Sequence, residues 1–180
     1  SQFKKFGISV LGVEPVENVA KISKGLAINT INEFFGEKVA NEIVKKYQHP
    51  KLIVANNVFA HIPDIQDFIS GISVLADKNT IITIENPSFT KLLENNLFDT
   101  IYHEHYSYLS AHAVSVIAKR NGLELIHVEE INTHGGSNRY WLSRSKKADS
   151  TVKRILEVEI NSGLFDRDKW NNFNKNVRNS

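Results

Sequence analysis

The segment 98–108 concentrates side chains that can transfer protons. It holds two imidazoles, His103 and His105, two carboxylates, Asp99 and Glu104, and three phenols. Burying so many polar and titratable groups without partners would cost several kcal/mol, so they are either solvated or gathered around a polar molecule. We interpret the segment as part of a site for a polar substrate, in which a histidine of ordinary pKa about 6.5 could act as a general base at neutral pH.

The spacing within this segment leaves two alternatives open. His103 and His105 would share one face of an extended strand, and Tyr102 and Glu104 would lie on the other. Since only one face can meet a substrate, we expect His103 to be structural or exposed. A rival hypothesis makes His112 the third ligand of a metal held by the other two histidines, with Glu104 as the base, because imidazole is the commonest metal ligand.

The composition narrows the function classes. The chain has 180 residues, 41% of them hydrophobic, and a formal charge of +2, which predicts a globular protein with no nucleic-acid partner. The absence of cysteine excludes disulfides, thiolate metal sites and a cysteine nucleophile. No apolar run approaches the roughly 18 residues of a membrane helix, and no signal peptide is recognisable, so we expect a cytoplasmic protein without a membrane partner.

The segments that must position these side chains alternate between strand-like and helix-like patterns, which is typical of an α/β fold with a mostly parallel sheet and flanking helices. The pattern predicts an initial helix end closed by Gly7, a hairpin formed by the last two strands, and a helical tail. Strands are expected at 8–13, 27–28, 52–55, 80–85, 123–131 and 138–143, and helices from Pro15 to about Lys24, at 36–47, 64–75 and 110–121, and from Thr151 onward. A polar break at 145–150 divides the chain into a domain over 1–145 and a tail over 146–180.

Polar residues close several of the predicted strands. In an open α/β sheet, ligands bind outside the carboxyl ends of the strands, so Glu14, Asn56, Asn57 and Glu85 should lie along one rim. Glu14 could accept hydrogen bonds from the ribose hydroxyls of a nucleotide, or it could simply precede a helix whose dipole favours a carboxylate. Asn56 and Asn57 carry the same ambiguity.

The last strand begins beside the loop Gly135-Gly136-Ser137. This loop could be a simple hairpin connection. Arg139 could alternatively use its planar guanidinium to clamp a diphosphate.

Several of these segments, taken in order, resemble one family. Together they are similar to the S-adenosylmethionine-dependent sugar C-methyltransferases of deoxysugar biosynthesis. The segments are Gly12-Val13-Glu14-Pro15, Phe34-Phe35, Ala55-Asn56-Asn57-Val58, Ala60-His61, Tyr102-His103-Glu104-His105, and Gly135-Gly136-Ser137 with Arg139. The resemblance implies a Rossmann-like class I methyltransferase sheet, S-adenosylmethionine as cofactor and a nucleotide-linked keto-deoxysugar as substrate.

The resemblance also implies roles for individual residues. His105 occupies the family's general-base position, and Tyr102 and Glu104 match other active-site positions. The residues assigned in this way are His105, Glu104 and Tyr102 as catalytic, Glu14, Asn56 and Asn57 as cofactor-binding, and Glu85 and Arg139 as substrate-binding. Because the resemblance accounts for the histidines without a metal, we assign no metal ligand to this chain.

The chain also departs from the family pattern. The family's zinc-binding cysteines, which would form a separate N-terminal domain, and its glycine-rich loop are not in this sequence. The family's first strand, which would lie between the strands ending at Glu14 and Asn56, is likewise absent. We therefore expect the chain to be the middle of a longer protein or a truncated copy, with the tail leading toward a C-terminal domain, and to be inactive alone. The alternative is a non-catalytic α/β domain that serves as an interaction module.

Overall fold

The computed structural model describes residues 2–179 and contains strands in two sheets. The smaller sheet pairs β1 (Leu11–Val13) in parallel with β2 (Asn29–Ile31). The larger sheet has the order β3-β4-β6-β5, formed by β3 (Leu52–Asn56), β4 (Ile81–Pro87), β5 (Glu124–Ile131) and β6 (Ser137–Ser143). β3 runs parallel to β4, whereas β6 is antiparallel to both β4 and β5.

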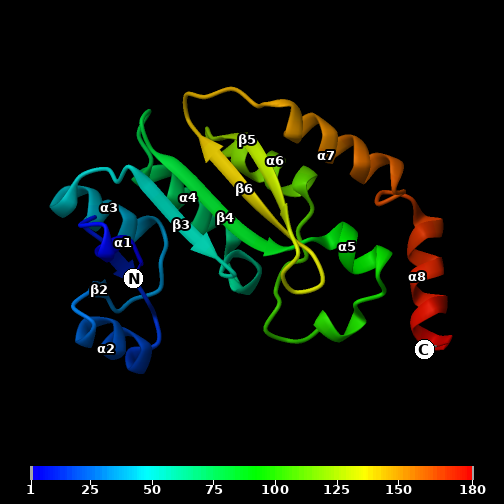
Figure 1. The fold of residues 1–180 in the computed structure, drawn as a ribbon, viewed down its shortest axis with the longest axis horizontal. Helices are drawn as coiled ribbons and strands as arrows, with labels where there is room; N and C mark the ends of the chain where they lie inside the picture. Colours follow the sequence, from blue (N-terminus) through cyan, green and yellow to red (C-terminus); the bar gives the residue numbers. More distant parts are fainter. Residues whose placement is uncertain (1, 180) are drawn as a thin grey trace.

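Helices connect and flank these strands (Figure 1). They are α1 (Gln2–Lys5), α2 (Glu17–Gly25), α3 (Glu37–Tyr47), α4 (Ile65–Leu75), α5 (Phe89–Glu94), α6 (Ala111–Arg120), α7 (Ser150–Asn161) and α8 (Arg167–Asn179). Two short 3-10 turns, η1 (Phe59–His61) and η2 (Phe98–Thr100), complete the chain path. None of the helices among residues 2–179 is long and apolar enough to cross a membrane.

The main core lies on one face of the larger sheet. Ile53 and Ala55 of β3 are paired in register with Ile82 and Ile84 of β4, and all of them are buried. The apolar stripe of α4, which includes Phe68 and Ile72, packs in the same cluster, as does α6. In Figure 1, both helices lie behind the strands. Burial of aliphatic and aromatic side chains in this layer supplies the main favourable term for folding.

Local signals in the sequence fix the starts of the two core helices. The Asp64 carboxylate accepts hydrogen bonds from the backbone N–H groups of Gln66 and Asp67 and begins α4. The Ser110 hydroxyl accepts one from Ala113 and begins α6. Both side chains satisfy N–H groups that would otherwise have no partner in the first turn, so these two predicted helices are confirmed.

The second strand begins later than the sequence predicts. Ala27 has a φ of 54° and its N–H bonds to the carbonyl of Lys24, while the N–H of Ile28 bonds to the carbonyl of Ser23. This is the Schellman arrangement that ends a helix, so residues 27–28 terminate α2 instead of forming a strand. The strand follows at Asn29–Ile31. The prediction was wrong because the left-handed position at the end of a helix is usually occupied by glycine, and here it is occupied by alanine.

The sheet is also not the single, mostly parallel sheet that the alternation predicts. β1 and β2 form a separate pair, and two of the three pairings in the larger sheet are antiparallel. The reason is that β6 returns between β4 and β5, and a direct return of this kind can only be antiparallel. The predicted hairpin of the last two strands is confirmed.

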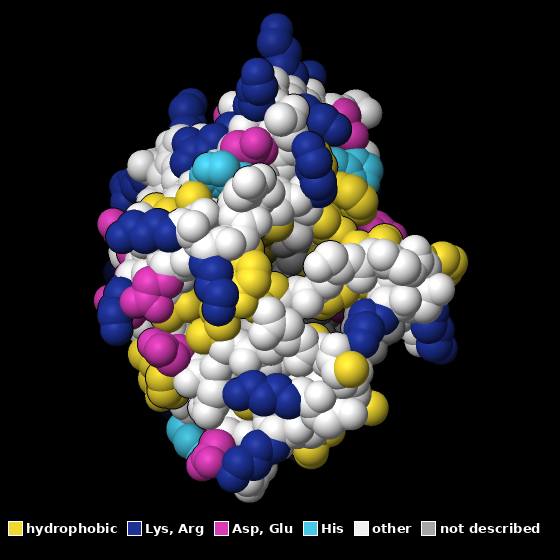
Figure 2. Space-filling model, turned by 90° about the vertical axis from the view of Figure 1, so that its left-hand side faces the viewer, with side chains coloured by type: hydrophobic (Ala, Val, Ile, Leu, Met, Phe, Trp, Pro, Cys, Tyr) yellow, Lys and Arg dark blue, Asp and Glu magenta, His cyan; other side chains and the backbone are white. Residues whose placement is uncertain are grey.

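Hydrophobic side chains are exposed at the end of the molecule formed by α1 and α2, among Lys and Arg side chains (Figure 2). They include Phe6, Ile8, Val16, Val19, Ile22 and Leu26. On β3, exposed Leu52 and Val54 alternate with the buried residues of the core face. The face of β3 that is turned away from α4 is therefore apolar and open.

The tail helix α7 joins the main core. Its Val152 and Ile155 belong to the same buried cluster as the sheet residues. Its Glu159 is fully buried and accepts hydrogen bonds from the N–H groups of Ala111 (2.6 Å) and His112 (2.8 Å) at the start of α6. Burial raises the pKa of Glu159, although these two hydrogen bonds oppose the shift.

Candidate active site

A cavity of about 340 Å³ lies beyond the carboxyl ends of β3 and β4. It brings together side chains from η1, from the segment after η2 and from the hairpin loop. The lining residues are Asn57, Ala60, His61, Pro87, Asp99, Thr100, Tyr102, His105 and His134. Three residues assigned from the sequence, Asn57, Tyr102 and His105, are therefore neighbours in space, and we call this space the histidine cavity.

His105 is held from both sides of its ring. Its Nδ1 lies 2.8 Å from the carbonyl oxygen of Thr100, and its Nε2 lies 3.3 Å from the hydroxyl of Tyr102. Since a carbonyl oxygen can only accept, the neutral ring carries its hydrogen on Nδ1. Nε2 is then left with a lone pair on the side of Tyr102, whose ring centroid is 4.3 Å from that of His105.

This arrangement corrects the expectation drawn from an extended strand. The N–H of His105 bonds to the carbonyl of Tyr102, so residues 102–105 form a turn. In a turn, residues three apart can lie on the same side, whereas in a strand these two would point to opposite faces. His103 is exposed and is not part of the cavity lining.

His61 is a member of the site to which sequence reasoning gave no role. Its ring centroid is 4.6 Å from that of His105, and its Nδ1 lies 2.9 Å from the carbonyl oxygen of Glu104. The N–H groups of Tyr106 and Ser107 also bond to the carbonyl of Ala60, which fastens the segment to η1. The available signal was the position of His61, shortly after a buried strand whose carboxyl end faces the ligand rim.

Asn57 directly follows β3 in a left-handed conformation, with a φ of 53°. Its N–H bonds at 2.7 Å to the carbonyl of Glu85, which continues the pairing of β3 with β4. Asparagine tolerates this conformation better than most residues, and the turn places its side chain in the cavity. Asn56, one residue earlier, is exposed at the end of β3 but does not line the cavity.

Glu104 contributes to this geometry through its backbone. Its carbonyl fixes His61, while its side chain is exposed and does not line the cavity. The role predicted for its carboxylate, holding a sugar hydroxyl, stays a prediction.

Glu14 lies directly after β1. Its Oε1 accepts a hydrogen bond of 2.8 Å from the N–H of Val16, the residue before α2. This contact corresponds to the alternative in which the carboxylate precedes the helix. The prediction that Pro15 lies in the first helical turn is wrong, because α2 begins at Glu17. The amide of Asn32 bonds to the carbonyls of Glu14 and Pro15 and holds this corner in place. The assignment of Glu14 to a nucleotide ribose stays a prediction.

Glu85 and Arg139 contact each other, and neither residue lines the histidine cavity. Nη2 of Arg139 lies 2.8 Å from Oε2 of Glu85, and Nη1 lies 2.9 Å from Oε2 of Glu129. Bonding to Glu85 first, and then to Glu129, raises the pKa of Arg139. To clamp a diphosphate, as predicted, Arg139 would have to give up these two carboxylates.

The rival metal hypothesis finds no support in the geometry. Among residues 2–179, no three His, Asp or Glu side chains are grouped so that they could hold a metal ion. His112 packs edge-on against Phe165, with 5.2 Å between ring centroids.

Comparisons with known proteins agree with this architecture. Residues 1–128 match the model of the methyltransferase domain family, and the chain therefore belongs to that family. C-methyltransferase NovU of Streptomyces niveus is 36% identical over 135 residues, which make up 75% of this chain and 32% of that protein. The chain thus spans about a third of the length of this relative.

Solved structures show the fold. A SAM-dependent methyltransferase from Methanosarcina mazei has a TM-score of 0.57 and 10% identity, with 81% of this chain and 86% of that chain covered. Magnesium protoporphyrin IX methyltransferase from Synechocystis PCC 6803, solved with bound SAH, has a TM-score of 0.55 and 14% identity, with 78% and 66% covered. The α/β arrangement of this chain is that of the class I methyltransferases.

Proposed function

We propose that this chain carries the catalytic centre of an S-adenosylmethionine-dependent C-methyltransferase whose substrate is a nucleotide-linked keto-deoxysugar. The relative NovU is named a C-methyltransferase, which supports a carbon atom as the acceptor of the methyl group. The observation that carries the proposal is the hydrogen bond between Nδ1 of His105 and the carbonyl of Thr100. It places the lone pair of a neutral imidazole on Nε2, which can accept a proton inside the histidine cavity once the Tyr102 hydroxyl, 3.3 Å away, turns to the substrate.

The residues of the histidine cavity suit proton removal beside a ketone. Nε2 of His105 would take the proton from the sugar carbon next to the carbonyl group, and the electron pair of that C–H bond would move onto the carbonyl oxygen. The hydroxyl of Tyr102 or the amide of Asn57 could donate a hydrogen bond to that oxygen as its charge develops. Tyr102 would then exchange its contact with Nε2 for one with the substrate.

The cofactor contributes the group that is transferred. When bound, S-adenosylmethionine supplies a methyl group on a positively charged sulfur, which is an electrophile for the carbon that has lost its proton. Glu14 fits a role in holding it, because only Oε1 of its carboxylate is engaged by Val16, and it lies at a strand end where nucleotides bind in this fold. Asn56 and Asn57 at the end of β3 are the other candidates.

The test measures proton removal separately from methyl transfer. In the enzyme incubated with the sugar substrate in deuterated water, His105→Gln should slow exchange of the carbon-bound proton by about 100-fold to 10,000-fold, the usual contribution of a general base. His103→Gln is the matched control, because this neighbouring histidine is exposed outside the cavity, and it should exchange at the normal rate.

Cofactor affinity should be unchanged in both variants, because the imidazole is assigned to the sugar. Undiminished exchange in His105→Gln would remove the base assignment. Both measurements are made in the full-length enzyme, because we expect this chain to be inactive alone, and absence of exchange in the unmodified full-length enzyme would favour the non-catalytic interaction module.

A further inference from the structure

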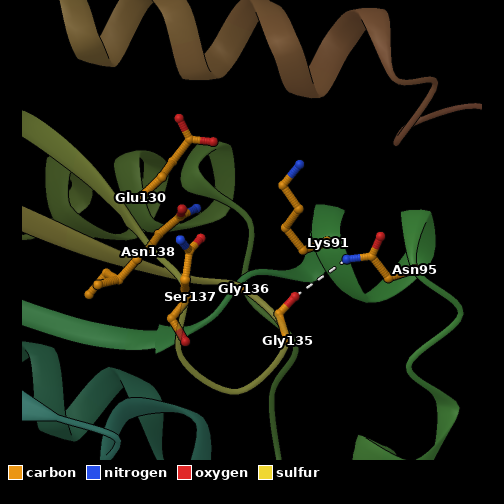
Figure 3. A pocket seen from close by; sticks show the side chains of 9 residues that line it. Lys91, Asn95, Glu130, Gly135, Gly136, Ser137 and Asn138 are labelled. Atoms are coloured by element: carbon orange, nitrogen blue, oxygen red, sulfur yellow. Dashed lines mark hydrogen bonds between the residues drawn. The ribbon is translucent and has the colours of Figure 1, made fainter.

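A second cavity, of about 410 Å³, lies on the other side of the hairpin loop, between α5 and the turn that joins β5 to β6. We call it the hairpin cavity. Its polar lining includes Lys91, Asn95, Glu130, Asn132, Ser137 and Asn138 (Figure 3). In this view the side chains of Lys91 and Glu130 rise on opposite sides of the space, and Asn138 and Ser137 lie below Glu130. The lining therefore offers both hydrogen-bond donors and acceptors.

The charges around the hairpin cavity cancel one another. Nζ of Lys91 lies 2.8 Å from Oε2 of Glu94, and Oε2 of Glu130 lies 2.6 Å from Nη2 of Arg154. A diphosphate would have to compete with Glu94 for Lys91 and would face Glu130 as a like charge. An uncharged group with several hydroxyls fits this lining better, because each hydroxyl can both donate to an amide oxygen or carboxylate and accept from an amide or ammonium N–H.

The loop that forms one wall has a fixed conformation. His134, Gly135 and Gly136 follow one another with φ values of 52°, 77° and 120°. The N–H of Gly136 donates to the carbonyl of Thr133 at 2.9 Å, its carbonyl accepts from the N–H of Ser88 at 3.0 Å, and the carbonyl of Gly135 accepts from the side-chain amide of Asn95 at 3.4 Å. A Cβ on Gly136 would come within 2.9 Å of the Lys91 side chain, so glycine allows the loop and α5 to approach closely and define the cavity.

The same loop separates the two cavities. His134 lines the histidine cavity, whereas Gly135, Gly136 and Ser137 line the hairpin cavity. A ligand with two sugars could therefore place one sugar in the histidine cavity beside His105 and the other in the hairpin cavity. A nucleotide sugar is such a molecule, because its reactive sugar and its nucleoside sugar are joined by a flexible diphosphate.

We propose that the hairpin cavity is a subsite for the hydroxyl-bearing nucleoside sugar of the substrate, a role that rests on the proposed function. The subsite contributes affinity and orientation, and Asn132, an exposed asparagine on its rim, donates or accepts one of the hydrogen bonds. The diphosphate lies outside this cavity, where the paired charges do not oppose it.

The experiment follows backbone amide signals of the ¹⁵N-labelled protein by NMR during titration with three probes: UDP-glucose, uridine and glucose. UDP-glucose should shift the amide signals of Gly135 and Gly136 together with the amide signals of residues around His105. Uridine should shift only the amide signals of the loop. Asn132→Ala should weaken uridine binding by about three- to tenfold, the usual effect of losing one hydrogen bond. Asn79→Ala, which removes an exposed asparagine in a turn outside the cavity, should leave binding unchanged.

The possible outcomes separate the subsite from the catalytic proposal. Shifts around His105 without shifts in the loop would overturn the subsite and leave the proposed function standing. Shifts in the loop alone with UDP-glucose would support the subsite and count against the sugar position beside His105. Loop shifts with glucose but not with uridine, or unchanged uridine affinity in Asn132→Ala, would overturn the nucleoside assignment.

Discussion

At the scale of single residues, Asp149 has the most perturbed acidity among the exposed groups of the tail. Its carboxylate accepts hydrogen bonds from the hydroxyl and N–H of Thr151, and Oδ2 lies 2.7 Å from Nδ1 of His127. The bond from the Thr151 hydroxyl, followed by the contact with His127, lowers the pKa of Asp149 from 3.8 to about 2. The carboxylate therefore begins α7 and also ties the tail to β5.

This lowered pKa predicts a pH dependence of stability. A carboxyl group that is more acidic in the folded state stabilises the fold above its unfolded pKa of 3.8, and the contribution is lost as the pH falls toward about 2. Asp149→Asn keeps an oxygen that can begin the helix but removes this titration. Its denaturant midpoint should lie below that of the unmodified protein at pH 6, and the two should converge near pH 2.

Urea titrations at pH 2, 3, 4 and 6 would measure this effect. Asp168→Asn, at an exposed position in α8, is the matched control and should follow the unmodified protein throughout. A constant difference between Asp149→Asn and the unmodified protein across this range would contradict the linkage.

Candidate site residues could be named from the sequence where they lie within one short segment, although an extended strand would have placed Tyr102 and His105 on opposite faces. Tyr102 and His105 are three residues apart, and a local turn suffices to bring them together. The partnership of His105 with His61 depends on contacts between η1 and residues 104–107, which are some forty positions away and leave no local pattern. The Arg139 contact with Glu85 was unpredictable for a similar reason, because it follows from the register of β4 with β6.

At the scale of elements, the tail helix α8 reaches the histidine cavity through a series of rings. Trp170 packs on Phe89 with 5.2 Å between centroids, Phe89 lies 6.2 Å from Tyr108, and Tyr108 lies edge-on to His105 at 6.0 Å. Phe173 of α8 packs with Leu92, Leu93 and Leu164 in the same small cluster. The tail therefore supports the segment that holds the candidate base, a contact that its helical periodicity alone could not reveal.

Trp170→Ala should lower the rate of substrate proton exchange by about tenfold without changing KM, because a small displacement of the base slows the chemical step more than it weakens binding. Trp170→Phe should restore most of the rate, since a ring can still pack on Phe89. Phe165→Ala, which removes a tail ring that packs on His112 outside this series, is the control. Equal losses in Trp170→Ala and Phe165→Ala would indicate general destabilisation of the tail.

The elements themselves followed from the sequence wherever caps and periodicity agree, as at Asp64 and Ser110. The predicted bounds were wrong where a residue adopts a backbone conformation that its residue type does not indicate. Ala27 ends α2 in a left-handed conformation, and the strand predicted at 27–28 therefore begins only at Asn29. Pro15 likewise lies before the helix, because the Glu14 carboxylate takes the N–H of Val16.

At the scale of the whole molecule, the division into two sheets predicts that stability is uneven. β4 is hydrogen-bonded on both sides, and its Ile82 and Ile84 are fully buried. β1 and β2 pair only with each other within the described residues, and none of the β1 side chains is fully buried. A two-stranded sheet is at best marginally stable by itself, so the segment of α1, β1, α2 and β2 should open more easily than the larger sheet.

Hydrogen exchange would measure this difference directly. At neutral pH the amides of Gly12 and Ile31 should exchange at least about 100-fold faster than those of Ile82 and Leu142, since opening the small sheet leaves the larger sheet intact. Adding S-adenosylmethionine provides a second measurement, because Glu14 ends the less stable strand. If Glu14 holds the cofactor, ligand should slow exchange at β1 and leave β6 unchanged, as binding stabilises only the units that it contacts. Equal protection of both sheets without ligand would show that the two open together as one cooperative unit, despite the absence of hydrogen bonds between β1 and β3 among the described residues.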